Sequence, residues 1–106
     1  MLKSLHADYY QSIIQIRPYN EEVMRLINNQ VKKDKAVFIS KIVRSKHGVD
    51  LFLSSNKFAR MIGKKLKESF KGELTESVKL FSRDKVTSKN LYRVTVCFRL
   101  ENDEET

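Results

Sequence analysis

Apolar and polar residues alternate along five stretches of the chain and repeat with helical spacing along two others. Alternation places successive side chains on opposite faces of a strand, whereas a repeat every three or four residues places them along one side of a helix. Pro18 ends the first alternating stretch, because proline cannot donate a hydrogen bond to a neighbouring strand. The pattern predicts strands over residues 9–17, 36–44, 49–54, 73–81 and 89–100, and helices that begin near Asn20 and Ser55.

The ends of the two helices are marked by polar residues and a glycine. Asn20 is a favourable N-cap, and Glu21 and Glu22 follow in the first turn, where the helix dipole favours negative charge. Gly72 follows the second helix and predicts a left-handed glycine cap at its carboxyl end. Gly63 lies inside that helix, where its small size predicts close packing against a neighbouring element.

The order of these elements is β-α-β-β-α-β-β. Antiparallel hairpins beside two helices predict an α+β fold. We expect a two-layer sandwich with a mainly antiparallel sheet, both helices on one face and the other face open. A chain of 106 residues is long enough for one core. We therefore expect a single domain over residues 1–100, followed by an acidic tail over residues 101–106.

The strand alternation also predicts which side chains point into the core and which lie on the open face. One side of the first strand would present Tyr10 inward, together with Ser12, Ile14 and Ile16. The open face would then carry Ile13, Phe52 and Arg93. An outward phenylalanine among arginines could stack on a base, or a neighbouring domain could cover it. The aromatic-rich signature of an RNA-recognition motif is absent, which favours a protein cover.

Charge is the feature of the composition that bears most on function. The chain carries 21 Lys and Arg against 13 Asp and Glu, a net charge of +8. Four of the acidic residues lie in the last six positions, so residues 1–100 carry +12. A small domain this basic is typical of proteins that bind nucleic acid or another polyanion. A lysine-rich surface that serves solubility alone is the alternative.

Five cations of the second helix fall on one side of it. At 100° per residue they lie within about 80° of arc, opposite the apolar positions. We refer to them as the basic row: Lys57, Arg60, Lys64, Lys67 and Lys71. Such a row could neutralise successive phosphates, although a solvated helix face is the alternative. A second basic group around the last hairpin could grip a phosphate backbone, and its members are Arg83, Lys85, Lys89 and Arg93.

Residues that could carry catalysis or hold a metal are few and scattered. His6 and His47 have no partner at the spacing of a metal site or a catalytic triad. Cys97 is the single cysteine, which excludes an intrachain disulfide and a zinc site built on cysteines. No apolar run reaches the roughly 18 residues of a membrane span. We expect a non-enzymatic, cytoplasmic protein with no metal, no cofactor and no membrane partner.

Five stretches of sequence together resemble one protein family. They read YYQSIIQIR (9–17), GVDLFLSS (48–55), FAR (58–60), SVKLFSRD (77–84) and NLYRVT (90–95). Their order and spacing are similar to those of the Nmd-three family of large-subunit export adaptors, which were named for nonsense-mediated mRNA decay. The lysine-rich style resembles an archaeal member.

The resemblance implies a non-enzymatic factor that binds the large ribosomal subunit during ribosome maturation or translation. Eukaryotic relatives act as export adaptors through a C-terminal leucine-rich signal, and full-length relatives carry paired-cysteine zinc motifs. Cys97 is the one cysteine here and the sequence shows no C-terminal leucine-rich signal, so we carry over neither zinc binding nor export. We expect either an excised domain of a longer parent protein or a short relative.

Two functional hypotheses follow. In the first, the basic row contacts ribosomal RNA phosphates, alone or together with ribosomal protein, while Arg83, Lys85 and Lys89 clamp a neighbouring segment. In the second, the domain docks on protein through Phe52, Ile13 and Arg93 of the open sheet face, with no direct RNA contact.

Overall fold

The elements of the protein follow the predicted order and confirm the α+β fold. The computed structural model describes residues 10–83 and 90–101. The strands and helices are β1 (Ser12–Arg17), α1 (Glu21–Lys33), β2 (Ile39–Ser45), β3 (Gly48–Leu53), α2 (Asn56–Ser69), β4 (Gly72–Arg83) and β5 (Asn90–Leu100).

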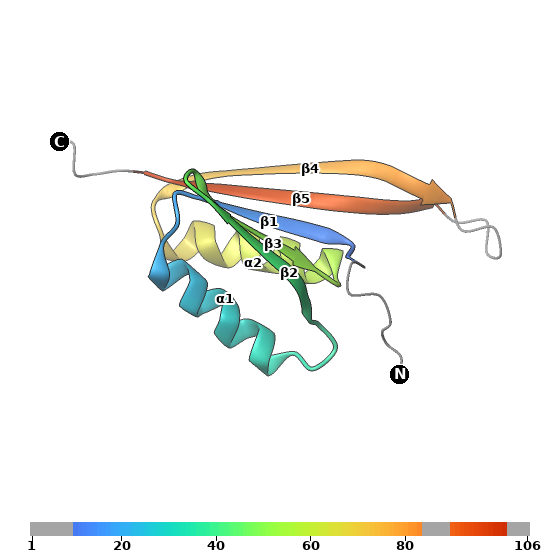
Figure 1. Ribbon diagram of the computed structural model, residues 1–106, viewed down its shortest axis with the longest axis horizontal. Helices are drawn as coiled ribbons and strands as arrows, with labels where there is room; N and C mark the ends of the chain where they lie inside the picture. The colour runs from blue at the N-terminus through green and yellow to red at the C-terminus, as the bar shows by residue number, and fades with distance from the viewer. Residues whose placement is uncertain (1–9, 84–89, 102–106) are drawn as a thin grey trace.

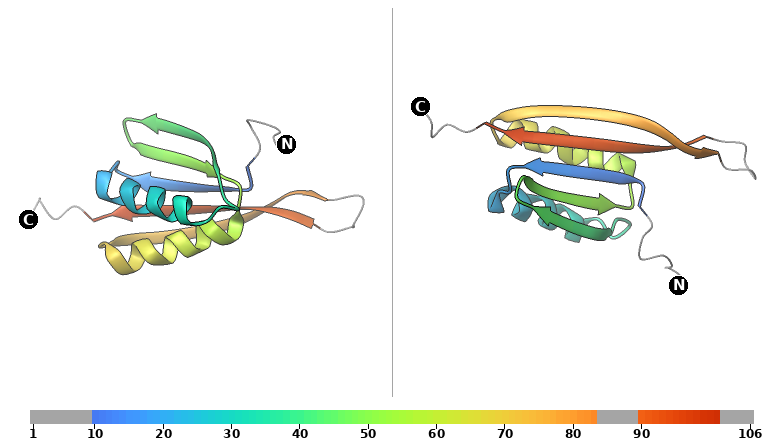
Figure 2. Two further views of the ribbon diagram at one scale, coloured as in Figure 1. Left: turned by 90° about the horizontal axis from the view of Figure 1, so that it is seen from below. Right: turned by 45° about the horizontal axis from the view of Figure 1, so that its top comes forward.

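The strands form one five-stranded sheet in the order β2-β3-β1-β5-β4. β1 lies at its centre, antiparallel to β3 and parallel to β5, and the two hairpins β2–β3 and β4–β5 complete the sheet on either side. Both helices lie on the same face, and no element of the described chain covers the opposite face (Figures 1 and 2). The carboxyl ends of β1 and β5 therefore meet at one end of the sheet, beside the turn of the β2–β3 hairpin.

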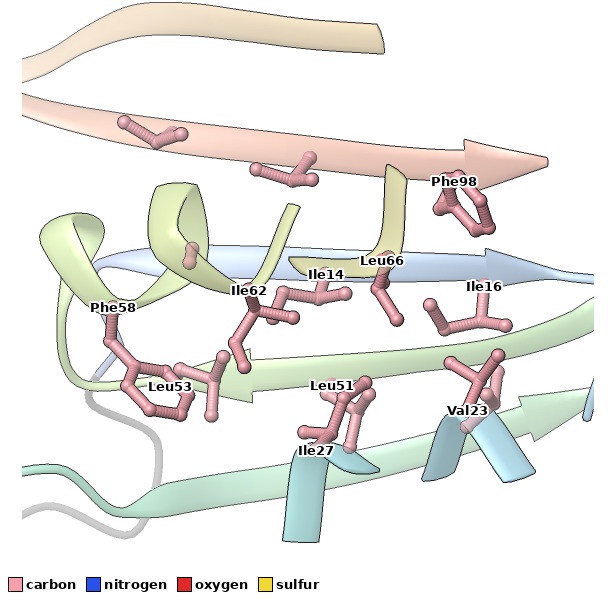
Figure 3. Close-up of a cluster of buried hydrophobic side chains, with 14 of the residues drawn as sticks. Ile14, Ile16, Val23, Ile27, Leu51, Leu53, Phe58, Ile62, Leu66 and Phe98 are labelled. Atoms are coloured by element: carbon pink, nitrogen blue, oxygen red, sulfur yellow. The ribbon is translucent and has the colours of Figure 1, made fainter. Parts of the chain in front are cut away.

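The core lies between the sheet and the two helices. Phe58, Ile62 and Leu66 project from α2 toward the central strands, and Ile27 of α1 lies against Leu51 of β3 (Figure 3). The inward sides of the strands contribute seven further buried apolar residues: Ile14, Ile16, Val49, Leu53, Val94, Val96 and Phe98. The inward positions predicted for Ser12, Ile14 and Ile16 are thus confirmed, and Phe52, between buried Leu51 and Leu53, points away from the core as predicted.

Both helices begin at polar caps. The Asn20 side chain accepts a hydrogen bond from the backbone N–H of Val23 at 3.0 Å, and Ser55 Oγ accepts one from Phe58 at 3.0 Å. These bonds satisfy N–H groups that have no partner within the first turn of a helix. Gly63 is buried, and a methyl group there would lie 3.1 Å from Val96 Cγ1, which confirms the predicted close packing.

The first strand begins at Ser12, later than the alternation predicts. Asn56, the first residue of α2, takes the place that an earlier part of β1 would fill beside β5. Its side-chain amide donates to the carbonyl oxygen of Tyr92 at 2.9 Å and accepts from the N–H of Val94 at 3.2 Å. Because the edge of β5 is already bonded there, β1 cannot extend further along it.

The predicted left-handed cap at Gly72 is wrong. Residue 70 ends α2 in an extended conformation, and Gly72 is already the first residue of β4, opposite Leu100. A Cβ atom at Gly72 would lie 2.5 Å from the carbonyl oxygen of Arg99, so close strand packing requires glycine here. The positive φ belongs to Gly48 instead, at 151°.

Two further strand boundaries differ from prediction. β2 begins at Ile39, because Asp34 closes a turn by accepting the N–H of Ala36 and of Val37. β4 continues to Arg83 and carries the β4–β5 hairpin beyond Asn56, the first residue of α2 (Figure 1). Val78, Leu80 and Tyr92 consequently remain exposed on the helix side of the sheet.

Candidate nucleic-acid interface

The basic row lies along the outer side of α2 and continues into the following turn. Lys57, Arg60, Lys64 and Lys67 are exposed on the helix, opposite its buried residues. Lys71 lies beyond the end of α2, in the turn before β4, so it belongs to the row but not to the helix as predicted. Its carbonyl oxygen accepts the N–H of Glu101 at 3.0 Å, which ties this turn to the end of β5.

The members of the row differ in how far they are already engaged. Arg60 Nε lies 2.6 Å from Glu76 Oε2 of β4, an ion pair between partly exposed side chains. Lys67 Nζ reaches the carbonyl oxygen of Gly72 at 3.5 Å, which is a weak contact. Within residues 10–83 and 90–101, Lys57, Lys64 and Lys71 have no ion-pair partner. The row therefore presents four ammonium groups of one sign to solvent.

The second predicted basic group is described in part. Arg83 is the last residue of β4, but its side chain, Lys85 and Lys89 lie outside the described residues. Arg93 is on the open face of the sheet, where its guanidinium carbon lies 4.0 Å from the centre of the Tyr10 ring. The grouping of these four cations around one loop stays a prediction.

The three residues predicted for protein docking do lie together on the open sheet face. Ile13 of β1 is paired in register with Phe52 of β3, and Arg93 lies on neighbouring β5. The Tyr10 ring meets Phe52 edge-on at 4.9 Å, and Lys41 Nζ lies 4.9 Å from the centre of the Phe52 ring. Phe52 is therefore partly covered by side chains of this same chain.

Tyr10 is not an inward residue, contrary to the prediction. It precedes β1, so the strand alternation does not set its direction, and its ring packs on the open face instead. A groove of about 380 Å³ runs beside it, lined among others by Ile13, Lys79 and Arg93.

A cleft that the sequence analysis did not identify opens at the end of the sheet. It has a volume of about 590 Å³ and is lined by Arg17, Pro18, Lys46, His47, Arg99 and Leu100. These residues come from three separate segments of the chain. Arg17 and Arg99 are register partners on the parallel strands β1 and β5. Sequence alone could not reveal this group, because it does not show that β1 and β5 are neighbours.

A family model supplies the relationship of this chain to known proteins. The model of the NMD3 second domain matches residues 9–100. The chain belongs to the NMD3 family. The matched region contains all seven elements, and with them the basic row, the open face and the cleft. No curated protein matches the chain in a direct sequence comparison.

Membership of the NMD3 family gives the domain a ribosome-related role, since this is a family of ribosome-associated adaptors. Within the described residues, the side chains of His, Cys, Asp and Glu form no group of three that could hold a metal ion. Cys97 is half-buried in β5 and is a free cysteine. Neither helix of the described part is long and apolar enough to cross a membrane.

Proposed function

We propose that this NMD3-family domain is a binding module that contacts the large ribosomal subunit in the cytoplasm, through ribosomal RNA phosphates held by the basic row. The observation that carries the proposal is the exposure of Lys57, Lys64, Lys67 and Lys71 along one side of the molecule. Solvated lysine ammonium groups are suited to neutralise phosphates, and the release of counterions favours such binding.

The row is rigid enough to fix the register of a phosphate backbone. Lys57 and Lys67 are ten residues apart on one helix, which separates them by about 15 Å along its axis. The helix is anchored by Phe58, Ile62 and Leu66, none of which is more than 3% exposed. The helix backbone therefore holds the Cα atoms of these residues in a fixed line, while the flexible lysine side chains adapt to the RNA.

Docking on protein through the open sheet face is the second candidate function. The groove beside Ile13 and Arg93 supports it, because a surface lined by both apolar and polar side chains suits a protein partner. The contacts of Tyr10 and Lys41 with Phe52 count against an anchor role for that ring, since it already has partners within the chain.

Site-specific crosslinking distinguishes the two candidates. A photoreactive amino acid would replace Lys64 in the basic row and, in a matched variant, Lys79, an exposed lysine that lines the groove on the open face. Each variant is bound to purified large subunits, irradiated and analysed for crosslinked RNA and protein. We expect position 64 to give ribosomal RNA crosslinks and position 79 to give none. RNA crosslinks from position 79 with none from position 64 would contradict the proposal.

A further inference from the structure

The cleft at the end of the sheet gathers positive charge from three segments. Arg17 and Pro18 follow directly on one another at the end of β1, Lys46 and His47 form the turn between β2 and β3, and Arg99 lies at the end of β5. The parallel pairing of β1 and β5 brings the strand ends together at the side of the sheet where the β2–β3 turn also lies (Figure 1).

Arg17 is held in place by contacts built into the fold. Its NH1 group donates to the carbonyl oxygens of Ile16 and Val49, at 3.2 and 3.3 Å, and its NH2 group lies 2.8 Å from Asp50 Oδ1. Gly48 makes this possible: an added Cβ would lie 3.0 Å from Arg17 Cδ and 2.0 Å from the Ile16 carbonyl oxygen. A guanidinium has five N–H donors, so these contacts use at most three of them.

The other basic residues of the cleft have no acidic partner within the described chain. Lys46, His47 and Arg99 are exposed, and none of them forms an ion pair among residues 10–83 and 90–101. Glu73 is the register partner of Arg99 on β4, yet no ion pair joins the two side chains. Asp50 offsets Arg17, so the lining keeps a positive excess from Lys46 and Arg99.

Two arginines from neighbouring strands line the cleft. Arg17 and Arg99 are neighbours on adjacent strands, and both lie on the open face of the sheet. The Arg17 guanidinium is turned toward Val49 and Asp50 of β3, so Lys46 and Arg99 hold the positive charge that an anion in the cleft would offset. Arginine forks and a lysine ammonium match the oxygens of a phosphate group, which accepts several charge-assisted hydrogen bonds at once.

We infer that this cleft is a binding site for a phosphate group, contacted by Lys46, Arg99 and the remaining donors of Arg17, with His47 at its rim. The ligand is either a phosphodiester of RNA or a free phosphate, since both present the same oxygens. The cleft shares no residue with the basic row, so this inference does not depend on the proposed function.

Nuclear magnetic resonance of the 106-residue chain provides the test. ¹⁵N-labelled protein at low ionic strength is titrated with inorganic phosphate and, separately, with a uridine pentanucleotide. We expect the largest shifts at residues 17, 46–48 and 99, and we expect the Lys46→Gln/Arg99→Gln variant to bind phosphate about tenfold more weakly, because two charge-assisted contacts are lost.

The Lys64→Gln/Lys67→Gln variant is the matched control, since it removes the same charge from the basic row. We expect it to change phosphate affinity less than about twofold, because distant exposed charges are screened. All four side chains are exposed, and the spectra themselves report whether each variant is folded.

If the same amides saturate at a much lower concentration of pentanucleotide than of inorganic phosphate, RNA is the source of the bound phosphate group. If both ligands saturate them at the same concentration, the ligand is free phosphate. Equal weakening by both variants, or shifts spread evenly over all basic residues, would overturn the site. Neither result would bear on whether residues 64 and 67 bind the large subunit, which is measured separately.

Discussion

Cations on the two sides of this domain are engaged in different ways. On the open sheet face, Lys41 and Arg93 lie against aromatic rings and Arg17 is paired with Asp50. Along the basic row, Arg60 is the one member of five that is committed to a carboxylate of the described chain. Lys79 and Arg99 of the open face also have no ring or carboxylate contact within the described chain, but four such lysines lie beside α2, so most of the available charge of the two surfaces lies there.

The difference shows that a count of basic residues does not measure the capacity to bind a polyanion. A cation that already contacts a carboxylate is partly neutralised, and one that lies on a ring loses part of that contact if it turns toward a phosphate. A solvated lysine loses mainly water and side-chain entropy. The basic row is therefore the surface on which substitutions should change RNA binding most.

Charge reversal in the basic row should have the largest effect. Lys64→Glu/Lys67→Glu removes two phosphate contacts and adds repulsion, so we expect affinity for purified large subunits to fall by at least about 50-fold near 0.1 M salt. Sedimentation of labelled protein with the subunits measures this. The matched variant is Lys41→Glu/Lys79→Glu on the open face, where we expect a loss below about threefold from the altered net charge alone. If both variants lost the same affinity, binding would depend on the total charge of the domain and not on which surface carries it.

Gly48→Ala should destabilise the domain more than any substitution of an exposed side chain. The residue has a φ of 151°, and a Cβ would lie 2.0 Å from a backbone oxygen. We expect the free energy of unfolding to fall by about 2 kcal/mol or more in urea titrations. Gly63→Ala is the matched control, because there the new methyl group meets only the side chains of Val96 and Leu74, at 3.1 and 3.2 Å. If both variants lost the same free energy of unfolding, backbone geometry would not be the reason for the destabilisation at residue 48.

Phe52→Leu should separate stability from RNA binding on the open face. The substitution removes the contacts with Tyr10 and Lys41, and we expect a loss of about 1 kcal/mol in the free energy of unfolding. Affinity for large subunits should stay within about twofold of the wild type, since the basic row is untouched. Loss of subunit binding in a folded Phe52→Leu protein would favour docking on protein instead.

Arg60→Gln should have the smallest effect on stability. The ion pair with Glu76 is largely exposed, and such pairs contribute less than about 1 kcal/mol. Thermal unfolding at low and high salt measures the difference, and high salt should reduce it further. A loss that persists at high salt would mean that Arg60 contributes through packing of its aliphatic part.

Periodicity predicted most of the fold because local patterns encode it. The Asn20 cap, the buried alternation in β1 and β5, and the amphipathic α2 all follow from neighbouring residues. Long-range contacts explain the errors. The start of β1 depends on the bonds of Asn56 with β5, and the role of Gly72 depends on the approach of Arg99.

The candidate sites divide in the same way. The basic row is contained within one helix and its following turn, so spacing alone predicts it. The cleft joins Arg17, Lys46 and Arg99 across three segments, and it exists because β1 and β5 are parallel neighbours. Tertiary structure likewise brings together cations and rings that are far apart in the sequence, such as Arg93 and Tyr10.

The salt dependence of binding tests the central claim most directly. The dissociation constant of the chain for purified large subunits is measured over a series of monovalent salt concentrations. If the four exposed lysines of the basic row each neutralise a phosphate, a plot of log affinity against log salt should have a slope between about −3 and −4. Lys64→Glu/Lys67→Glu should make that slope shallower by about two, whereas Lys41→Glu/Lys79→Glu should leave it unchanged. A wild-type affinity that is flat across the series would contradict the account.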